Sequence, residues 1–141
     1  MDLTEIYLPS RTRRLSRPVI MWHIPAGFPS PAEDYVEGRI DLNRDLIRHP
    51  LATFYIRVKG DSMEPRIQTG ALIIVDRMAE TKDDDIVVVR IGSDFMVKKL
   101  HIEKDGRIWL LSENTAYQPI QITEEMDFEV WGKVTHSIQS Y

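Results

Sequence analysis

The amino-acid sequence predicts a mainly β fold: a small, twisted antiparallel sheet or sandwich that follows a flexible N-terminal arm and one or two short helices. Two observations lead to this fold class. From residue 51 onward the apolar segments are short and rich in Ile, Val, Phe, Tyr and Trp, which are residues that strands favour. Gly, Asp and Asn separate these segments, as they do at tight turns between strands. The 141 residues are enough for one domain with its own core.

The N-terminal part of the chain, up to position 40, lacks the pattern of a folded domain, and we expect it to form the flexible arm. Several prolines interrupt its sequence, and the apolar patch at residues 19–22 is long enough for one strand at most. Pro31, with acidic residues soon after it, suits the start of a short helix. We therefore expect an arm over residues 1–40 and a β-rich domain over residues 41–141.

A second short helix is expected where the β-rich domain begins. Asp41 suits the N-cap position, because its carboxylate can accept hydrogen bonds from the free N–H groups of a first helical turn. The segment Leu42 to His49 places apolar residues along one side, and Pro50 then ends the helix.

Six strands are expected in the β-rich domain. Gly92-Ser93-Asp94 and Lys104-Asp105-Gly106 have the composition of hairpin turns, so neighbouring strands should be mostly antiparallel. The six expected strands are 54–59, 71–75, 85–90, 95–102, 107–111 and 128–138.

Composition and charge narrow the possible functions. The chain has no cysteine, which excludes disulfides and thiol catalysis, and it has no apolar run near 18 residues, so we expect no membrane span. The net charge of -4 argues weakly against general binding to nucleic acid. The charge is uneven, because residues 1–26 hold four arginines against two acidic residues. This basic arm either contacts DNA or an acidic partner, or is a solvated leader.

Lys98 is a candidate general base. Side chains alternate between the faces of a strand, so Lys98 and Lys99 lie on opposite faces. Burial disfavours the ammonium form and lowers a lysine pKa, and a neutral amine can take a proton from a serine hydroxyl. Alternatively, the aliphatic stem packs while the amine reaches water. The neighbours that share the face of Lys98 are all apolar: Met96, Leu100 and Ile102.

Ser62 is the candidate nucleophile, because it lies where an apolar run passes into a turn. A rigid strand aims such a side chain, and the turn gives it access to a substrate. The backbone N–H groups of a turn can also form an oxyanion hole. Gly-Asp-Ser is nevertheless an ordinary turn composition, so the hydroxyl could simply bond the local backbone.

No metal or cofactor motif is present in the sequence. The four histidines are far apart and form no HxxxH pattern, and the chain has neither a P-loop nor GxGxxG. Asp83-Asp84-Asp85 lacks the spaced ligands of a calcium loop and suits a solvated turn. We expect no metal and no cofactor.

Five segments in order resemble the LexA/UmuD family of self-cleaving serine peptidases. Within that family, residues 26–32 and 34–37 are similar to the cleavage region of the UmuD branch. The resemblance covers residues 26–141. The five segments are Gly60-Asp61-Ser62-Met63, Gly70-Ala71-Leu72-Ile73-Ile74-Val75-Asp76, Asp85-Ile86-Val87, Val97-Lys98-Lys99-Leu100 and Asn114-Thr115-Ala116-Tyr117-Gln118-Pro119-Ile120.

This resemblance implies a role for each matching residue. Ser62 matches the nucleophile and Lys98 matches the general base. The backbone amides around Asp61 and Ser62 match the oxyanion hole. The bond between Ala26 and Gly27 matches the bond that such a protein cuts in itself, and a glycine there lets the backbone approach the nucleophile closely.

The same resemblance implies the fold, the partners and the location. It implies a peptidase fold like the C-terminal domain of LexA, a homodimer and a cytoplasmic protein. Self-cleavage would be stimulated by a RecA filament on single-stranded DNA. The product would join an error-prone translesion DNA polymerase as a subunit, without a membrane and without strong direct DNA binding.

Three other functions remain open from the sequence. The first is a non-catalytic interaction module that keeps this fold. The second is a cleavable transcriptional repressor like LexA, against which the lack of a recognisable DNA-binding domain argues. The third is a membrane signal peptidase with Ser/Lys chemistry, for which we find no anchor segment.

Overall fold

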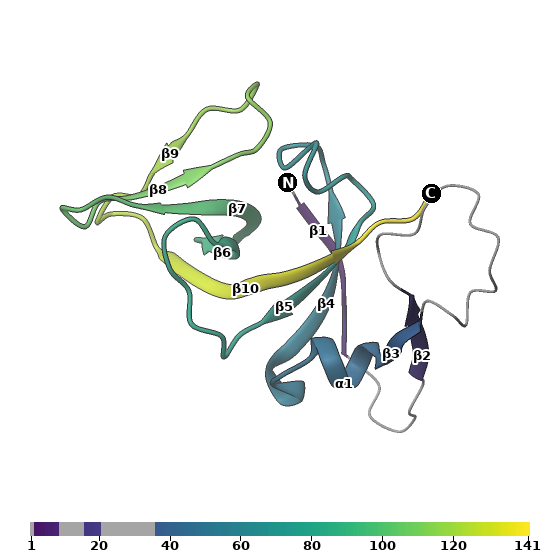
Figure 1. The fold of residues 1–141 in the computed structure, drawn as a ribbon. Coiled ribbons are helices and arrows are strands. Elements are labelled where there is room, and N and C mark those ends of the chain that lie inside the picture. The colour runs from purple at the N-terminus through teal and green to yellow at the C-terminus, as the bar shows by residue number, and fades with distance from the viewer. Residues whose placement is uncertain (1, 9–15, 21–35) are drawn as a thin grey trace. The chain divides into compact units, whose positions relative to one another are not determined.

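The computed structural model describes residues 2–8, 16–20 and 36–141, with side chains at residues 7, 8 and 41–141 (Figure 1). The expected helix start at Pro31 and the Ala26–Gly27 bond lie outside the described residues. The chain divides into two compact units, one formed by Met1–Pro9 with His49–Tyr141 and the other by Ser10–Arg48.

Within the described residues, the larger unit is built on one antiparallel sheet of eight strands in the order β1-β4-β5-β10-β6-β7-β8-β9. The mainly β fold class is therefore confirmed. The strands are β1 (Asp2–Tyr7), β4 (Thr53–Lys59), β5 (Leu72–Asp76), β6 (Ile86–Ile91), β7 (Asp94–Ile102), β8 (Ile108–Leu111), β9 (Ile120–Gln121) and β10 (Phe128–Ile138).

All six strands expected from the sequence are present, with ends that differ by one residue at most. The turn between β6 and β7 is the two-residue hairpin Gly92-Ser93, in which Gly92 has a φ of 59°. A positive φ at the first position of a two-residue hairpin turn favours glycine. The β7–β8 hairpin turns near Asp105, as expected.

Strand β10 joins the two halves of the sheet and is the long curved strand in Figure 1. It pairs with β6 through residues 128–133 and with β5 through residues 133–138. The register shifts between Val130 and Gly132 and again between Val134 and His136. Such irregularities bend a strand and increase its twist, which lets β10 pair with both β5 and β6.

Gly132 in β10 packs too closely against β5 for a larger side chain. A methyl group at this position would lie 2.6 Å from Cγ1 of Val75, which is fully buried. We expect Gly132→Ala to lower the free energy of unfolding by about 1–2 kcal/mol, because the packed core must shift. Urea unfolding measures this change. An equal loss when Gly132→Ala is made in a Val75→Ala background would contradict the clash as the cause.

Strand β1 differs from the expectation that residues 1–40 form an arm. Residues Asp2–Tyr7 pair with β4 in antiparallel register, so they form the edge of the large sheet. The division of the chain at residue 40 stays a prediction.

The smaller unit contains a two-stranded sheet of β2 (Ser16–Ile20) and β3 (Val36–Asp41), followed by helix α1 (Leu42–Leu46). Asp41 caps this helix as expected, accepting hydrogen bonds from the N–H groups of Asn43 and Arg44. The helix ends at Leu46, before the expected end at His49. His49 instead belongs to the larger unit, where its Nδ1 lies 2.6 Å from the Asp76 carboxylate.

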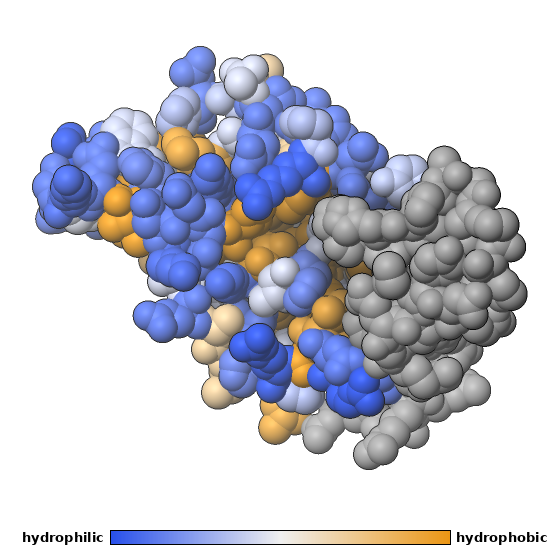
Figure 2. Space-filling view, in the orientation of Figure 1, coloured by the Kyte–Doolittle hydropathy of each residue, from blue (hydrophilic) through white to orange (hydrophobic). Residues whose placement is uncertain are grey.

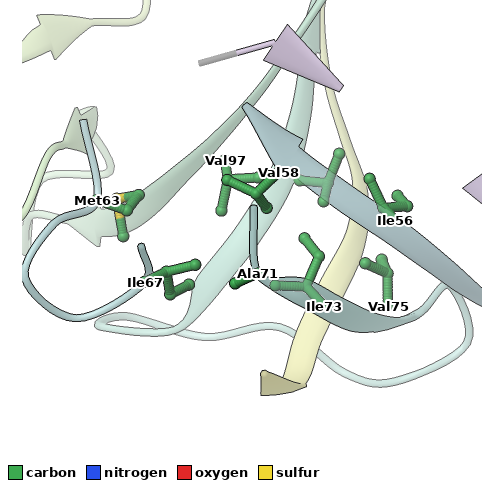
Figure 3. Close-up of a cluster of buried hydrophobic side chains, with 9 residues drawn as sticks. Ile56, Val58, Met63, Ile67, Ala71, Ile73, Val75 and Val97 are labelled. Atoms are coloured by element: carbon green, nitrogen blue, oxygen red, sulfur yellow. The ribbon is translucent and has the colours of Figure 1, made fainter. Parts of the chain in front are cut away.

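The core consists of two clusters of buried apolar side chains in the larger unit. Alternation along β6 separates them, because Val88 belongs to one cluster while Val87 and Val89 belong to the other. Figure 3 shows the first cluster, which includes Met63 from the turn after β4 and Val97 from β7. The residues next to Met63 and Val97 are Ser62 and Lys98, so both candidate segments contribute a neighbouring side chain to this cluster.

The outer surface is mixed in character. Figure 2 shows apolar side chains between hydrophilic ones on the visible face. Leu51 and Met78 are among the large apolar side chains that are exposed. Scattered exposure of this kind is ordinary for a folded chain and defines no site. No helix in the described part of the chain is long and apolar enough to cross a membrane.

Candidate active site

Ser62 lies in the turn that follows β4, and its side chain is fully buried. Gly60 opens this turn with a φ of 94°, a conformation that favours glycine. The Gly60 N–H donates to Oγ1 of Thr69, which holds the turn against the chain that leads into β5. Within the described residues Ser62 Oγ has no hydrogen-bond partner, so the alternative of a local backbone hydrogen bond does not hold in this structure.

Lys98 lies in the middle of β7 and is 4% exposed. It pairs across the sheet with Val87, and Leu100 on the same face of β7 is also buried. The apolar face expected from strand alternation is therefore present. Burial lowers the pKa of the Lys98 amine, because the ammonium form loses its hydration. The alternative of an amine that reaches water does not hold for this side chain.

The Lys98 amine has two partners in the segment that follows β8, which we call the bridging segment, residues 112–117. Its Nζ donates a hydrogen bond to Ser112 Oγ at 2.7 Å. Its Nζ also lies 5.3 Å from the centre of the Tyr117 ring. This ring contact favours the ammonium form and so opposes part of the effect of burial.

The bridging segment also binds the turn that carries Ser62. The Asn114 backbone N–H donates to the Ser62 carbonyl at 3.0 Å, and Asn114 Nδ2 donates to the Asp61 carbonyl at 3.1 Å. The Tyr117 hydroxyl donates to the Asp61 carboxylate. This acceptor raises the pKa of the Tyr117 hydroxyl. One short segment thus contacts both the Ser62 turn and the Lys98 amine.

Asn114 also fixes the direction of a backbone N–H group at the candidate oxyanion hole. A trans peptide is planar, with its C=O and N–H pointing in opposite directions. The Asp61 carbonyl points towards Asn114, so the Ser62 N–H of the same peptide points away from it. A fixed N–H at the nucleophile can stabilise a developing oxyanion.

The sequence reasoning missed Ser112 and gave no role to Asn114. The hairpin register could have found Ser112. Lys99 pairs with Leu111 across the turn centred at Asp105, and the next step of that register places Lys98 opposite Ser112. Asn114 belongs to a segment that the resemblance includes, but its role depends on a contact with a turn that is distant in the sequence.

A nucleophilic hydroxyl and a buried amine with a lowered pKa suit acyl transfer. The amine in its neutral form can take the hydroxyl proton, and the serine oxygen can then attack a carbonyl carbon. In this structure Lys98 bonds Ser112, while Ser62 Oγ has no hydrogen-bond partner among the described residues. Ser62 Oγ and Lys98 Nζ therefore share no hydrogen bond in this structure.

Two other groups of polar residues do not alter this site. Asp83, Asp84 and His101 place possible ligand atoms within 4.8 Å of one another. The Asp83 carboxylate already accepts the Ile102 N–H and lies 3.2 Å from His101 Nδ1, so the turn explains this group without an ion. A separate surface pocket is lined by charged residues of both signs, and neither Ser62 nor Lys98 lines it.

These features define a β-sheet domain that holds a buried serine and a buried lysine joined through one segment. The chain matches the Peptidase S24-like family over residues 18–135 and belongs to that family. The resemblance to the LexA/UmuD family is thereby confirmed.

The similar proteins identify the branch of this family. Protein SamA of Salmonella typhimurium is 43% identical over 119 residues, which cover 84% of this chain and 81% of SamA. Protein MucA of Escherichia coli is 38% identical over 140 residues, covering 98% of this chain and 93% of MucA. The LexA repressor of Geotalea uraniireducens is 38% identical over 119 residues, covering 83% of this chain and 58% of the repressor. These likenesses support a self-cleaving serine peptidase with a UmuD-like role in SOS mutagenesis.

Proposed function

We propose that this protein cuts its own Ala26–Gly27 bond with a Ser62/Lys98 dyad, and that the form beginning at Gly27 is a subunit of an error-prone translesion DNA polymerase. One observation carries the catalytic part of the proposal: a lysine with a lowered pKa is buried beside a segment that also binds the turn of a buried serine. Structural lysines rarely occupy such a position.

The proposed reaction is acyl transfer followed by hydrolysis. Neutral Lys98 takes the proton of Ser62, and the serine oxygen attacks the Ala26 carbonyl carbon. The backbone N–H groups at Asp61 and Ser62 stabilise the oxyanion. The bond to Gly27 breaks, and its nitrogen leaves with the proton that Lys98 carried. Water then hydrolyses the ester with Lys98 again as base, which releases Ala26 as a carboxylate and restores Ser62.

The wider role rests on the family. The protein acts in the cytoplasm as a homodimer, and a RecA filament on single-stranded DNA stimulates cleavage. A partner of this kind would act by favouring the state in which the Ala26–Gly27 segment occupies the site.

Intact-mass analysis of the full chain tests this function. The purified protein is held from neutral to alkaline pH, with and without RecA, ATP and single-stranded DNA. We expect two products that meet at the Ala26–Gly27 bond, formed faster at high pH or with the filament. Protein carrying Ser62→Ala, purified in the same way, controls for a contaminating protease. A chain that stays intact under every condition would contradict self-cleavage.

A non-catalytic interaction module of the same fold is the second candidate. One observation favours it: the Lys98 amine bonds Ser112, and Ser62 Oγ has no partner within the part of the chain that the structure describes. Binding of the intact chain to the RecA filament or to a translesion polymerase, without cleavage, would select this function.

A further inference from the structure

The hydrogen bond from Lys98 Nζ to Ser112 Oγ has no part in the reaction proposed above. At 2.7 Å it is short for a bond between an amine and a hydroxyl. Ser112 follows directly after β8 and is half-buried, whereas Lys98 is buried. A buried amine strongly needs a partner, so this contact decides how the amine is held.

Ser112 is itself held from both sides. On one side, Leu111 pairs with Lys99 as the last pair between β7 and β8. On the other side, Asn114 is fixed to the backbone of Asp61 and Ser62. The backbone of Ser112 is therefore held close to the amine, and its hydroxyl is in place to bind the lysine.

The hydrogen bond to Ser112 affects where the lone pair of the Lys98 amine points. A neutral lysine amine has two N–H bonds and one lone pair, and a general base must direct that lone pair at the proton it takes. An N–H group donated to Ser112 fixes one of these bond directions and leaves the lone pair available for the Ser62 proton. We propose that Ser112 is a positioning residue, which orients the Lys98 amine as the base for Ser62. This inference rests on the proposed function.

The groups around the amine allow the effect of pH to be worked out. Val87 on β6 and Leu100 on β7 are apolar. The titratable groups on the bridging segment are Tyr117 and Glu113. The Tyr117 hydroxyl faces Asp61 on the Ser62 turn, with Glu64 acting on it from further away, and the Glu113 carboxylate pairs with Arg66 at 3.1 Å. Ser112 is uncharged, but its oxygen accepts a hydrogen bond that is stronger when the amine is an ammonium. Removing the hydroxyl should therefore lower the pKa of Lys98 and, at the same time, release its orientation.

The test compares Ser112→Ala with Ser112→Thr in the full chain. We expect Ser112→Ala to cut the rate of self-cleavage about tenfold on the alkaline plateau, and to move the midpoint of the rate profile to lower pH. Near neutral pH the two effects oppose each other, so the plateau is the informative region. Ser112→Thr keeps a hydroxyl and should restore both the rate and the midpoint. Ser93→Ala, which removes a hydroxyl in the β6–β7 turn, is the matched control and should change neither.

A second measurement does not depend on cleavage. In the uncleavable Ser62→Ala chain, NMR titration of the Lys98 side chain should give a lower pKa when Ser112→Ala is added, and an unchanged pKa with Ser112→Thr. An unchanged midpoint, or a plateau rate at or above that of the wild type, would overturn the positioning role. Failure of the proposed function gives a different result, because Ser62→Ala protein would then behave like the wild type in the cleavage assay.

Discussion

Replacing Ser62 with alanine or Lys98 with methionine is expected to lower self-cleavage of the full chain by roughly 10⁴-fold or more. Ser62→Ala removes the oxygen that attacks the Ala26 carbonyl carbon, and Lys98→Met removes the base while keeping a side chain of similar length. The two residues act as a unit, so the double variant should be no slower than either single variant. Single-turnover rates measured by intact mass give these values.

Neighbouring substitutions provide the controls for this loss. Lys99→Met changes the adjacent lysine on the opposite face of β7, and we expect it to cleave at close to the wild-type rate. Thermal unfolding of each variant shows whether a loss of activity comes from a loss of structure. A folded Lys98→Met protein that still cleaves at the Ala26–Gly27 bond would refute the assignment of the base.

The lowered pKa of Lys98 also sets the direction of the pH dependence. The reactive form is the neutral amine, so the rate should rise with pH and level off above the pKa of Lys98 in the folded chain. Because burial lowers that pKa, the plateau should begin below the value of about 10.4 that an exposed lysine has.

The sheet was predictable because its signals are local. Alternating apolar residues and turn residues lie within each strand and hairpin, so all six expected strands appear. The other strands depend on partners elsewhere in the chain. Residues Asp2–Tyr7 pair with β4, which is distant in the sequence, and β9 contains only Ile120 and Gln121. Nothing within Asp2–Tyr7 specifies its distant partner, and the two residues of β9 are too few to show a strand pattern.

The candidate site likewise has features that the local sequence predicts and contacts that it does not predict. The apolar face around Lys98 follows from the alternation of one strand, and the position of Ser62 follows from one turn. The contacts between the bridging segment and the Ser62 turn do not follow from local sequence, because Asn114 and Tyr117 are distant from that turn along the chain. Family resemblance supplied the pairing of Ser62 with Lys98, and the structure adds the bridging segment that contacts both.

The same Lys98→Met substitution that removes activity is expected to stabilise the fold. Burial costs the ammonium several kcal/mol of hydration, and the hydrogen bond to Ser112 offsets only part of this cost. We expect the free energy of unfolding to rise by about 2–3 kcal/mol at neutral pH, measured by urea unfolding. The background is Ser62→Ala, so that every sample stays intact.

The gain should depend on pH in a direction fixed by proton linkage. The pKa of Lys98 is lower in the folded chain than in the unfolded chain, so the unfolded chain binds more protons between these two values. The lysine protein therefore becomes more stable as pH rises through this window, and the advantage of methionine shrinks until only its pH-independent part remains above about pH 10.4. Leu100→Met, on the same face of β7, changes shape without charge and should give a difference that is constant with pH. A gain from Lys98→Met that is equally constant would mean that packing, rather than the buried amine, limits the stability of this site, and the site would then lack the destabilised base that self-cleavage requires.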